Sequence, residues 1–177
     1  MATRPFGIDE PIFVLQHHRA SRVHFDFRLE HAGILWSWAV PKGPSCRPSV
    51  KRLAVRVEDH PLAYASFEGR IPAGSYGAGE VLVWDFGRWT PHADDVDAAV
   101  ARGHLGFDLA GRRLGGGWAL DRLRDDDWLL VKERDTAACD DGPDLTERFS
   151  GSVLTGRSFD DIATDPDAAV WTGDDVH

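Results

Sequence analysis

Three polar side chains alternate along one segment of the chain in a pattern that could hold a metal ion. His24, Asp26 and Arg28 are separated by single apolar residues, so an extended backbone places all three on one face, about 7 Å apart. His18 lies six residues upstream of His24, where a short loop brings the two imidazoles together. Two imidazoles and one carboxylate suit a divalent first-row metal ion and leave coordination positions open.

The arginine of this set indicates an anionic substrate. Arg28 follows the carboxylate by two residues, and a guanidinium binds phosphate through two parallel hydrogen bonds. Polar residues on one strand face also form the solvated side of a half-exposed sheet, so each residue alone has an ordinary structural explanation. The combined spacing favours a metal and phosphate site over that alternative.

A second polar group extends from Glu58 to Tyr64. Within it, His60 is a candidate for a further metal ligand, a hydrogen-bond donor to phosphate or a proton carrier. Asp59 could orient an imidazole. The alternative is a surface turn at the proline of this group. The glycine-rich segment from Gly74 to Gly79 matches neither a P-loop nor a dinucleotide-binding fingerprint, and we interpret it as a turn between strands.

Short strands are the elements that must position these residues. Alternating or apolar runs predict strands at 13–16, 23–30, 34–40, 51–57, 80–84, 87–89, 105–109, 117–123 and 128–132. In the fourth of these, Leu53, Val55 and Val57 are expected to face inward. Helices are predicted at 96–102, between an aspartate N-cap and Gly103, and at 159–163 after Ser158. This pattern predicts a mainly β fold, a barrel or sandwich with little helix.

Charge is distributed unevenly along the 177 residues, whose formal net charge is −9. Residues 17–57 include eight basic and two acidic residues, a net charge of +6. Residues 135–177 include two basic and eleven acidic residues, a net charge of −9. A uniformly basic nucleic-acid coat is therefore excluded, whereas a focused basic cleft that binds a strand end is not. Lys42 and Arg52 in the basic segment are further candidate phosphate contacts.

Cysteine and tryptophan content adds two expectations. Cys46 and Cys139 are the only cysteines, too few for a disulfide framework, so a reducing cytoplasm is the expected compartment. No apolar run approaches the ~20 residues that a bilayer requires, and the N-terminus lacks a secretory signal. The seven tryptophans are expected to lie mostly in the core.

Several segments resemble, in order and spacing, the 3′-phosphoesterase domain of bacterial DNA ligase D. They are Phe13–Glu30, Ser37–Pro44, Arg52–Tyr64, Phe67–Gly79, Gly103–Leu109 and Trp128–Arg134. The resemblance implies a compact β barrel over residues 12–135, preceded by an arm at 1–11. An acidic extension at 136–177 would pack on the barrel or trail from it.

The resemblance also implies a chemistry. The family trims 3′ ends in DNA repair by non-homologous end joining. Its members remove a 3′-terminal ribonucleoside and then hydrolyse the 3′-phosphate to a 3′-hydroxyl that a ligase can use. The expected cofactor is a divalent metal, most often Mn²⁺, with Zn²⁺ or Co²⁺ as alternatives. Residues that match the family's motifs have these implied roles: His18, His24 and Asp26 bind the metal, Arg28, His60 and Tyr64 engage phosphate and act in catalysis, and Gln16, Lys42 and Arg52 contact the substrate.

The expected partners are DNA or RNA–DNA 3′ ends at primer–template junctions. Related proteins often begin with a longer arm that carries an Arg-Asp pair, whereas only residues 1–11 precede the first strand here. We expect a free-standing, monomeric module that acts in the cytoplasm, at the nucleoid, beside a ligase or polymerase supplied in trans.

Two alternatives come from other functional classes. His24, Asp26 and His60 could form the two-His-one-carboxylate triad of a non-haem iron oxygenase. The additional His18 and the surrounding basic residues favour phosphate chemistry over that reading. The second alternative is a non-catalytic module that binds DNA ends.

Overall fold

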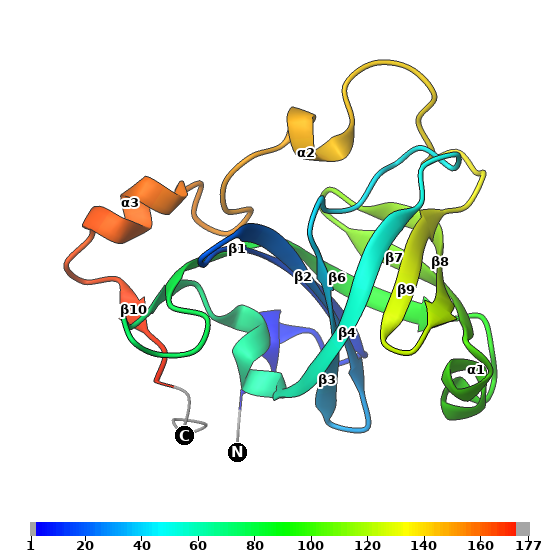
Figure 1. Cartoon of the computed structure of the whole chain (residues 1–177), viewed down its shortest axis with the longest axis horizontal. Helices are drawn as coiled ribbons and strands as arrows, with labels where there is room; N and C mark the ends of the chain where they lie inside the picture. Colours follow the sequence, from blue (N-terminus) through cyan, green and yellow to red (C-terminus); the bar gives the residue numbers. More distant parts are fainter. Residues whose placement is uncertain (1–2, 173–177) are drawn as a thin grey trace.

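The computed structural model describes residues 3–172, in which ten strands and five short helices form a mainly β molecule (Figure 1). The strands are β1 (Ile12–Arg19), β2 (Val23–His31), β3 (Ile34–Val40), β4 (Arg52–Pro61), β5 (Gly69–Ile71), β6 (Gly79–Pro91), β7 (His104–Gly111), β8 (Gly115–Arg124), β9 (Asp127–Lys132) and β10 (Ala169–Val170). The helices are η1 (Pro5–Gly7), η2 (Leu62–Ser66), α1 (Val96–Arg102), α2 (Leu145–Arg148) and α3 (Phe159–Thr164).

Eight of the strands described in residues 3–172 close into a barrel. Their order is β1-β2-β3-β4-β9-β8-β7-β6, and β6 pairs back with β1, so the sheet has no free edge there. The segments at 80–84 and 87–89, predicted as two strands, are parts of the single long strand β6. β5 pairs with one end of β6, and β10 adds to β5 in parallel. The predicted compact β barrel with little helix is confirmed.

Large aromatic side chains fill the barrel. Trp38, Trp84, Trp118 and Phe107 are almost completely buried in one apolar cluster. Six of the seven tryptophans are buried, as expected, and Trp171 is half-buried. Because alternate residues of a strand point to opposite faces, this interior leaves the other face of β1 and β2 free to carry polar groups.

The orientation predicted for β4 is wrong. Ala54 points into the barrel and is completely buried, whereas Leu53 is 43% exposed. Ala54 lies opposite Trp128 on β9, and the indole of Trp128 packs edge-on against that of Trp38 on β3. The two indoles occupy much of the interior at this point, so the small side chain of Ala54 is the one that packs there and the branched residues lie on the other face.

The C-terminal segment is held against the barrel at several points. Cys46, in the β3–β4 loop, forms a disulfide with Cys139, a single bridge that the sequence did not predict. Asp144 accepts hydrogen bonds from the Cys46 amide and the Ser45 hydroxyl. Figure 1 shows this segment running along one side of the barrel through α2 and α3. The last residues of the predicted acidic extension, 173–177, lie outside the described residues.

The arm before β1 is described from Thr3 onward and is fixed to the barrel. Arg4 forms an ion pair with Glu30 on β2, and Phe6 stacks on Phe86 of β6 with ring centroids 4.0 Å apart. None of the helices in residues 3–172 has the length and hydropathy that a bilayer crossing requires.

Candidate metal and phosphate site

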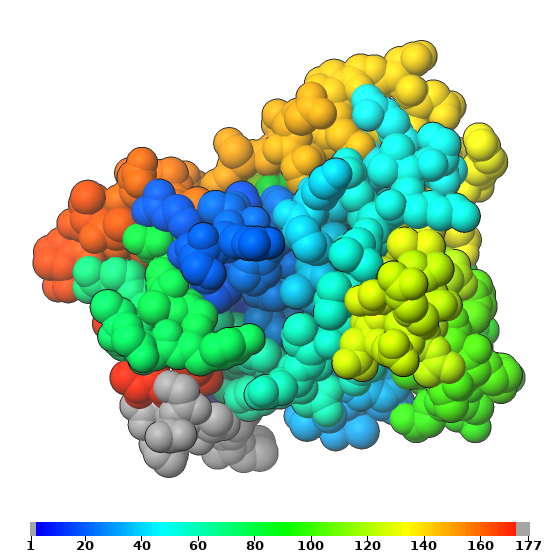
Figure 2. Space-filling model, viewed as in Figure 1, coloured from blue at the N-terminus to red at the C-terminus, as the bar shows by residue number. Residues whose placement is uncertain are grey.

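A cavity of about 310 Å³ opens on the outer face of the barrel, over strands β1 to β4. The β1–β2 turn lines one side of it, and the loop between β5 and β6 lines another. Figure 2 shows these two segments, blue and green, side by side on one face of the molecule. Helix η2 contributes Tyr64 to the wall, so residues far apart in the sequence enclose the space.

Strand register brings the two predicted histidine ligands together. β1 and β2 pair so that His18 lies directly opposite His24 and Gln16 lies opposite Asp26. Directly opposed residues of an antiparallel pair have neighbouring side chains. The imidazole centroids of His18 and His24 are 4.9 Å apart, so the predicted approach of these two rings is confirmed.

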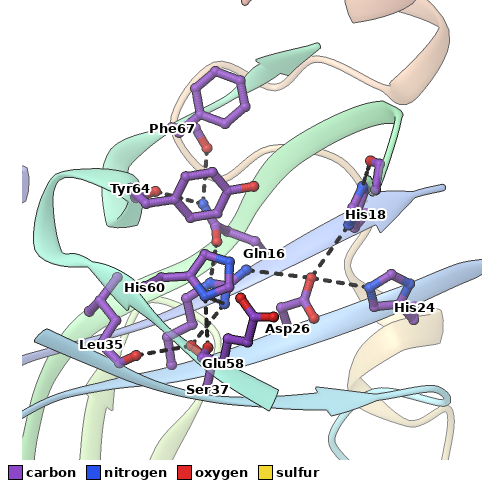
Figure 3. Close-up of polar contacts among 12 residues, drawn as sticks. Gln16, His18, His24, Asp26, Leu35, Ser37, Glu58, His60, Tyr64 and Phe67 are labelled. Carbon is purple, nitrogen blue, oxygen red and sulfur yellow. Dashed lines mark hydrogen bonds and ion pairs between the residues drawn. The ribbon is translucent and has the colours of Figure 1, made fainter. Parts of the chain in front are cut away.

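Asp26 is the point on which both imidazoles converge (Figure 3). Its Oδ2 lies 3.5 Å from Nδ1 of His18 and 3.2 Å from Nε2 of His24. Ligand atoms from these three residues all lie within 4.8 Å of one another. The structure therefore brings the predicted ligand set together, with one ring nitrogen of each histidine facing the carboxylate.

The other ring nitrogen of each histidine faces a backbone carbonyl. Nε2 of His18 lies 2.6 Å from the carbonyl oxygen of Gly77, and Nδ1 of His24 lies 3.1 Å from that of Arg22. A carbonyl can only accept, so each contact places a proton on that nitrogen; the nitrogen that faces Asp26 is then free to bind a metal in the neutral ring and donates to Asp26 in the protonated ring. Metal-binding histidines have this arrangement, with the second N–H held by a carbonyl or carboxylate.

Electrostatics keep Asp26 ionised. Burial disfavours the carboxylate, but hydrogen bonds with His18 and His24 and the charge of Arg28 outweigh burial and hold the pKa of Asp26 far below its ordinary value. The hydrogen bond with Asp26 raises the pKa of His24 despite partial burial. Two imidazole nitrogens and one ionised carboxylate form a ligand set that fits a divalent cation.

Arg28 supplies a buried positive charge beside this set. Its side chain is 3% exposed, and its Nη2 lies 3.6 Å from Oδ2 of Asp26. Its Nε donates to Oε1 of Gln16 at 2.7 Å, and its Nη1 donates to Oγ of Ser37 at 2.8 Å. The guanidinium also lies over the ring of Tyr64, 5.0 Å from the centroid. A side chain fixed on so many sides is preorganised to bind an anion.

Gln16 connects Arg28 to helix η2. Its Nε2 donates to the carbonyls of Tyr64 and Phe67, at 2.9 and 3.1 Å, while its Oε1 accepts from Arg28 (Figure 3). Gln16 is completely buried. Its carboxamide is occupied by protein contacts, so the substrate contact implied by the resemblance stays a prediction and a positioning role fits the geometry better.

His60 and Tyr64 form the wall opposite the histidine pair. Nδ1 of His60 lies 2.9 Å from the carbonyl oxygen of Glu58 and 3.1 Å from Nη1 of Arg28. Burial and the charge of Arg28 lower the pKa of His60, which favours the neutral ring. Burial raises the pKa of Tyr64 to about 12, so its phenol keeps its proton and can donate a hydrogen bond.

Lys42 and Arg52 do not join this cavity. Lys42 is exposed, two residues beyond the end of β3, and does not line the pocket. Arg52 lies near the C-terminal segment, with its Nη2 3.9 Å from Oδ2 of Asp144, and its Nε is buried without a hydrogen-bond partner. Their proposed contacts with substrate stay predictions.

Two contributors were missed from the sequence. Gly77, interpreted as part of a turn, supplies the carbonyl that orients His18, and Ser37 anchors Arg28. The one hydroxyl in the apolar run of β3 was the available signal for Ser37. The positive φ glycines around residue 77 indicated only a turn.

Comparison with known proteins identifies similar sequences. The family model described as the DNA ligase D 3′-phosphoesterase domain matches residues 16–122. A multifunctional non-homologous end joining protein LigD from Pseudomonas aeruginosa is 52% identical over 152 residues, covering 83% of this chain and 18% of that protein. A multifunctional non-homologous end joining DNA repair protein LigD from Mycobacterium tuberculosis H37Rv is 47% identical over 126 residues, covering 71% of this chain and 16% of that protein. The chain thus spans less than a fifth of the length of these relatives.

Proposed function

The chain belongs to the DNA ligase D 3′-phosphoesterase domain family, and from that premise we propose that it is a metal-dependent enzyme that removes the 3′-phosphate from DNA ends. Membership supports a role in DNA end processing within non-homologous end joining. The product would be a 3′-hydroxyl that a ligase can use.

One observation carries this proposal. One ring nitrogen each of His18 and His24 and the carboxylate of Asp26 converge beside the buried guanidinium of Arg28. A metal site beside an immobilised guanidinium is suited to a phosphate group, because different phosphate oxygens can contact the metal ion and the guanidinium. A solvated sheet face would not bury Asp26 and Arg28 together.

The proposed cofactor is a divalent metal ion, with Mn²⁺ preferred and Zn²⁺ or Co²⁺ as alternatives. His18, His24 and Asp26 would hold it. When bound, such an ion polarises a phosphoryl oxygen and lowers the pKa of water. Asp26 is committed to the two imidazoles, so it serves as a ligand rather than as a nucleophile.

The remaining residues bind and orient the phosphate. Arg28, whose Nε and Nη1 are held by Gln16 and Ser37, directs its remaining N–H groups at phosphate oxygens. Tyr64 donates its phenolic proton to another oxygen. His60 offers Nε2, and because a bound phosphate raises the pKa of a neighbouring imidazole, it can hold a proton near the leaving oxygen.

The proposal also covers further substrates and partners of the chain. Removal of a 3′-terminal ribonucleoside, action at RNA–DNA primer–template junctions and cooperation with a ligase or polymerase in trans are all proposed from the family. We propose that the chain acts as a monomer.

The site geometry does not favour the oxygenase alternative. The required triad needs His60 beside His24 and Asp26, but Nδ1 of His60 faces the Glu58 carbonyl and Arg28. Within residues 3–172, it is His18 that completes the ligand set. The non-catalytic end-binding module has no specific contact in its favour.

Phosphate release tests the proposal. An oligonucleotide with a 3′-phosphate is incubated with the protein and Mn²⁺, and the same oligonucleotide with a 5′-phosphate serves as the control. Release from the 3′ end alone, abolished by a chelator and restored by added Mn²⁺, is expected. Binding without release across divalent metals would support the end-binding module instead.

A further inference from the structure

A fully exposed tyrosine stands at the mouth of the metal and phosphate pocket. Tyr76 lines the cavity, yet its side chain is 100% exposed. Tyr64, the other tyrosine of the chain, is 4% exposed in the wall of the same cavity. Aromatic rings stabilise a fold when they are buried, so a ring held entirely in solvent beside a binding site is better explained by contact with a ligand.

The loop that carries Tyr76 is held in place by consecutive turns. The Ser75 amide donates to the Pro72 carbonyl, and the Ala78 amide donates to the Ser75 carbonyl, both at 3.1 Å. Gly77 has a φ of +75°, a value that glycine adopts without strain. The loop therefore presents Tyr76 from two hydrogen-bonded turns.

The same loop is linked directly to the ligand set. The carbonyl of Gly77, next to Tyr76, lies 2.6 Å from Nε2 of His18. The residue that displays the exposed ring is thus adjacent to the one that orients a ligand imidazole. Figure 2 shows this loop, in green, beside the β1–β2 turn that forms another part of the rim.

We propose that Tyr76 stacks on the nucleobase of the terminal nucleotide whose 3′-phosphate occupies the pocket. The inference rests on the proposed function, which places that phosphate against Arg28 and the metal ion that His18, His24 and Asp26 would hold. The sugar and base attached to that phosphate must then project out of the pocket through its mouth, where Tyr76 lies. Because every base has a π face, stacking binds strand ends with little regard to sequence, so Tyr76 is a positioning residue for the terminal nucleotide.

Steady-state kinetics with paired substrates test this role. Phosphate release is measured with a 3′-phosphorylated oligonucleotide whose terminal nucleotide carries adenine, and with one whose terminal sugar is abasic. Tyr76→Ala is expected to raise KM about tenfold on the adenine end, with kcat within twofold of the wild type. Tyr76→Phe keeps the ring and is expected to behave like the wild type.

The abasic substrate separates stacking from a general effect of the loop. With no base to stack on, the abasic end should give the wild type and Tyr76→Ala the same KM. Leu123→Ala removes another exposed apolar side chain, one that does not line the cavity, and should match the wild type on both substrates. An unchanged KM for Tyr76→Ala on the adenine end, or an equal loss on both ends, would overturn the proposal.

A binding measurement keeps this test independent of hydrolysis. With 2-aminopurine as the terminal base, stacking on Tyr76 should quench its fluorescence in the wild type and in Tyr76→Phe but not in Tyr76→Ala. Quenching without phosphate release from any metal-loaded sample would retain the stacking role while contradicting the proposed enzyme. Equal quenching by Tyr76→Ala would contradict the stacking role alone.

Discussion

The carboxamide oxygen of Gln16 accepts a 2.7 Å hydrogen bond from Nε of Arg28, the buried guanidinium of the proposed phosphate site. The amide nitrogen of Gln16 donates to the carbonyls of Tyr64 and Phe67. One buried side chain thereby sets the relative position of β1, β2 and helix η2, and with it the distance between Arg28 and Tyr64.

Replacement of Gln16 tests this positioning role. Gln16→Met keeps the volume but removes the acceptor of Arg28 and the donor to helix η2. Unsatisfied buried polar groups should lower the free energy of unfolding by about 1–3 kcal/mol, measured by chemical denaturation. We expect kcat for phosphate release to fall at least about tenfold, with a smaller change in KM.

Gln16→Glu is the matched variant, because it keeps an acceptor for Arg28 while it replaces the donor to the Tyr64 and Phe67 carbonyls by a carboxylate oxygen. It should lose less activity than Gln16→Met. Wild-type kcat in the methionine variant would show that Gln16 does not position Arg28.

Gly77 and Gly74 form a natural pair for testing how the loop orients His18. A Cβ at residue 77 would lie 3.2 Å from Cε1 of His18, whereas one at residue 74 meets nothing within 4 Å. Both glycines have positive φ, +75° and +86°, so both substitutions strain the backbone similarly. Gly77→Ala should weaken Mn²⁺ binding about 10- to 100-fold, as loss of a contact that orients a ligand does.

Calorimetric titration with Mn²⁺ measures this difference. Gly74→Ala should bind the ion with near wild-type affinity. Equal affinities for the two alanine variants would mean that the Gly77 contact does not hold His18 for the metal.

Glu68 gives the fold a predicted response to acid. It accepts hydrogen bonds from the Val83 amide at 2.9 Å, Thr155 Oγ1 at 2.6 Å and Arg157 Nη2 at 3.1 Å. Burial opposes ionisation, but these bonds and one with Ser152 lower the pKa of Glu68. A carboxyl whose pKa is lowered by folding adds stability above its unfolded pKa of about 4.3, and this stability disappears as pH falls through the folded value.

At pH 7 the free energy of unfolding of Glu68→Gln should therefore be lower than that of the wild type by about 1–3 kcal/mol. This difference between the two proteins should shrink as the pH falls below about 4.3. Denaturant titrations across pH measure it, with the exposed Glu147→Gln as control. A gap that stays constant down to pH 2 would contradict the assignment of Glu68.

The Cys46–Cys139 disulfide should stabilise the chain without affecting the pocket. It spans a sequence separation of 93 residues, and closing a loop of this kind is worth about 2–4 kcal/mol. Reduction should lower the free energy of unfolding by about that amount and leave Mn²⁺ affinity unchanged, because neither cysteine lines the cavity. The double variant Cys46→Ala/Cys139→Ala should be insensitive to the reductant, and a stability of the wild type that reductant does not change would refute the stabilising role.

Local signals predicted much of the fold. Asp95 caps α1 through the Ala98 amide and Gly103 ends the helix in a left-handed conformation, as the sequence indicated. The helix predicted after Ser158 is α3, which Ser158 caps by accepting from the Asp161 amide. The inward face of β4 was not predicted correctly, because Trp38 and Trp128, supplied by two other strands, decide which residue fits beneath it. The β1–β6 pairing that closes the barrel likewise depends on distant residues.

In the site, too, contacts within one hairpin were predicted from the sequence and contacts between distant segments were not. The spacing of His18, His24 and Asp26 predicted their convergence because a hairpin positions all three. The Gly77 carbonyl reaches His18 across 59 residues, and no local pattern encodes that contact. Cys46 and Cys139 are still further apart, with a sequence separation of 93 residues, so their pairing could not be deduced from composition.

Removal of a 3′-phosphate by the wild type and by Asp26→Asn tests whether the chain is a metal-dependent phosphoesterase. A 3′-phosphorylated primer–template is incubated with each protein over a range of Mn²⁺ concentrations, and the primer products are resolved on a denaturing gel. Asp97→Asn, which changes an exposed aspartate on α1, is the control. We expect Mn²⁺-dependent conversion to the 3′-hydroxyl primer by the wild type and the control, and loss of at least about 100-fold in Asp26→Asn while it remains folded. Full activity in folded Asp26→Asn, or equal conversion by the wild type without any divalent metal, would contradict this expectation.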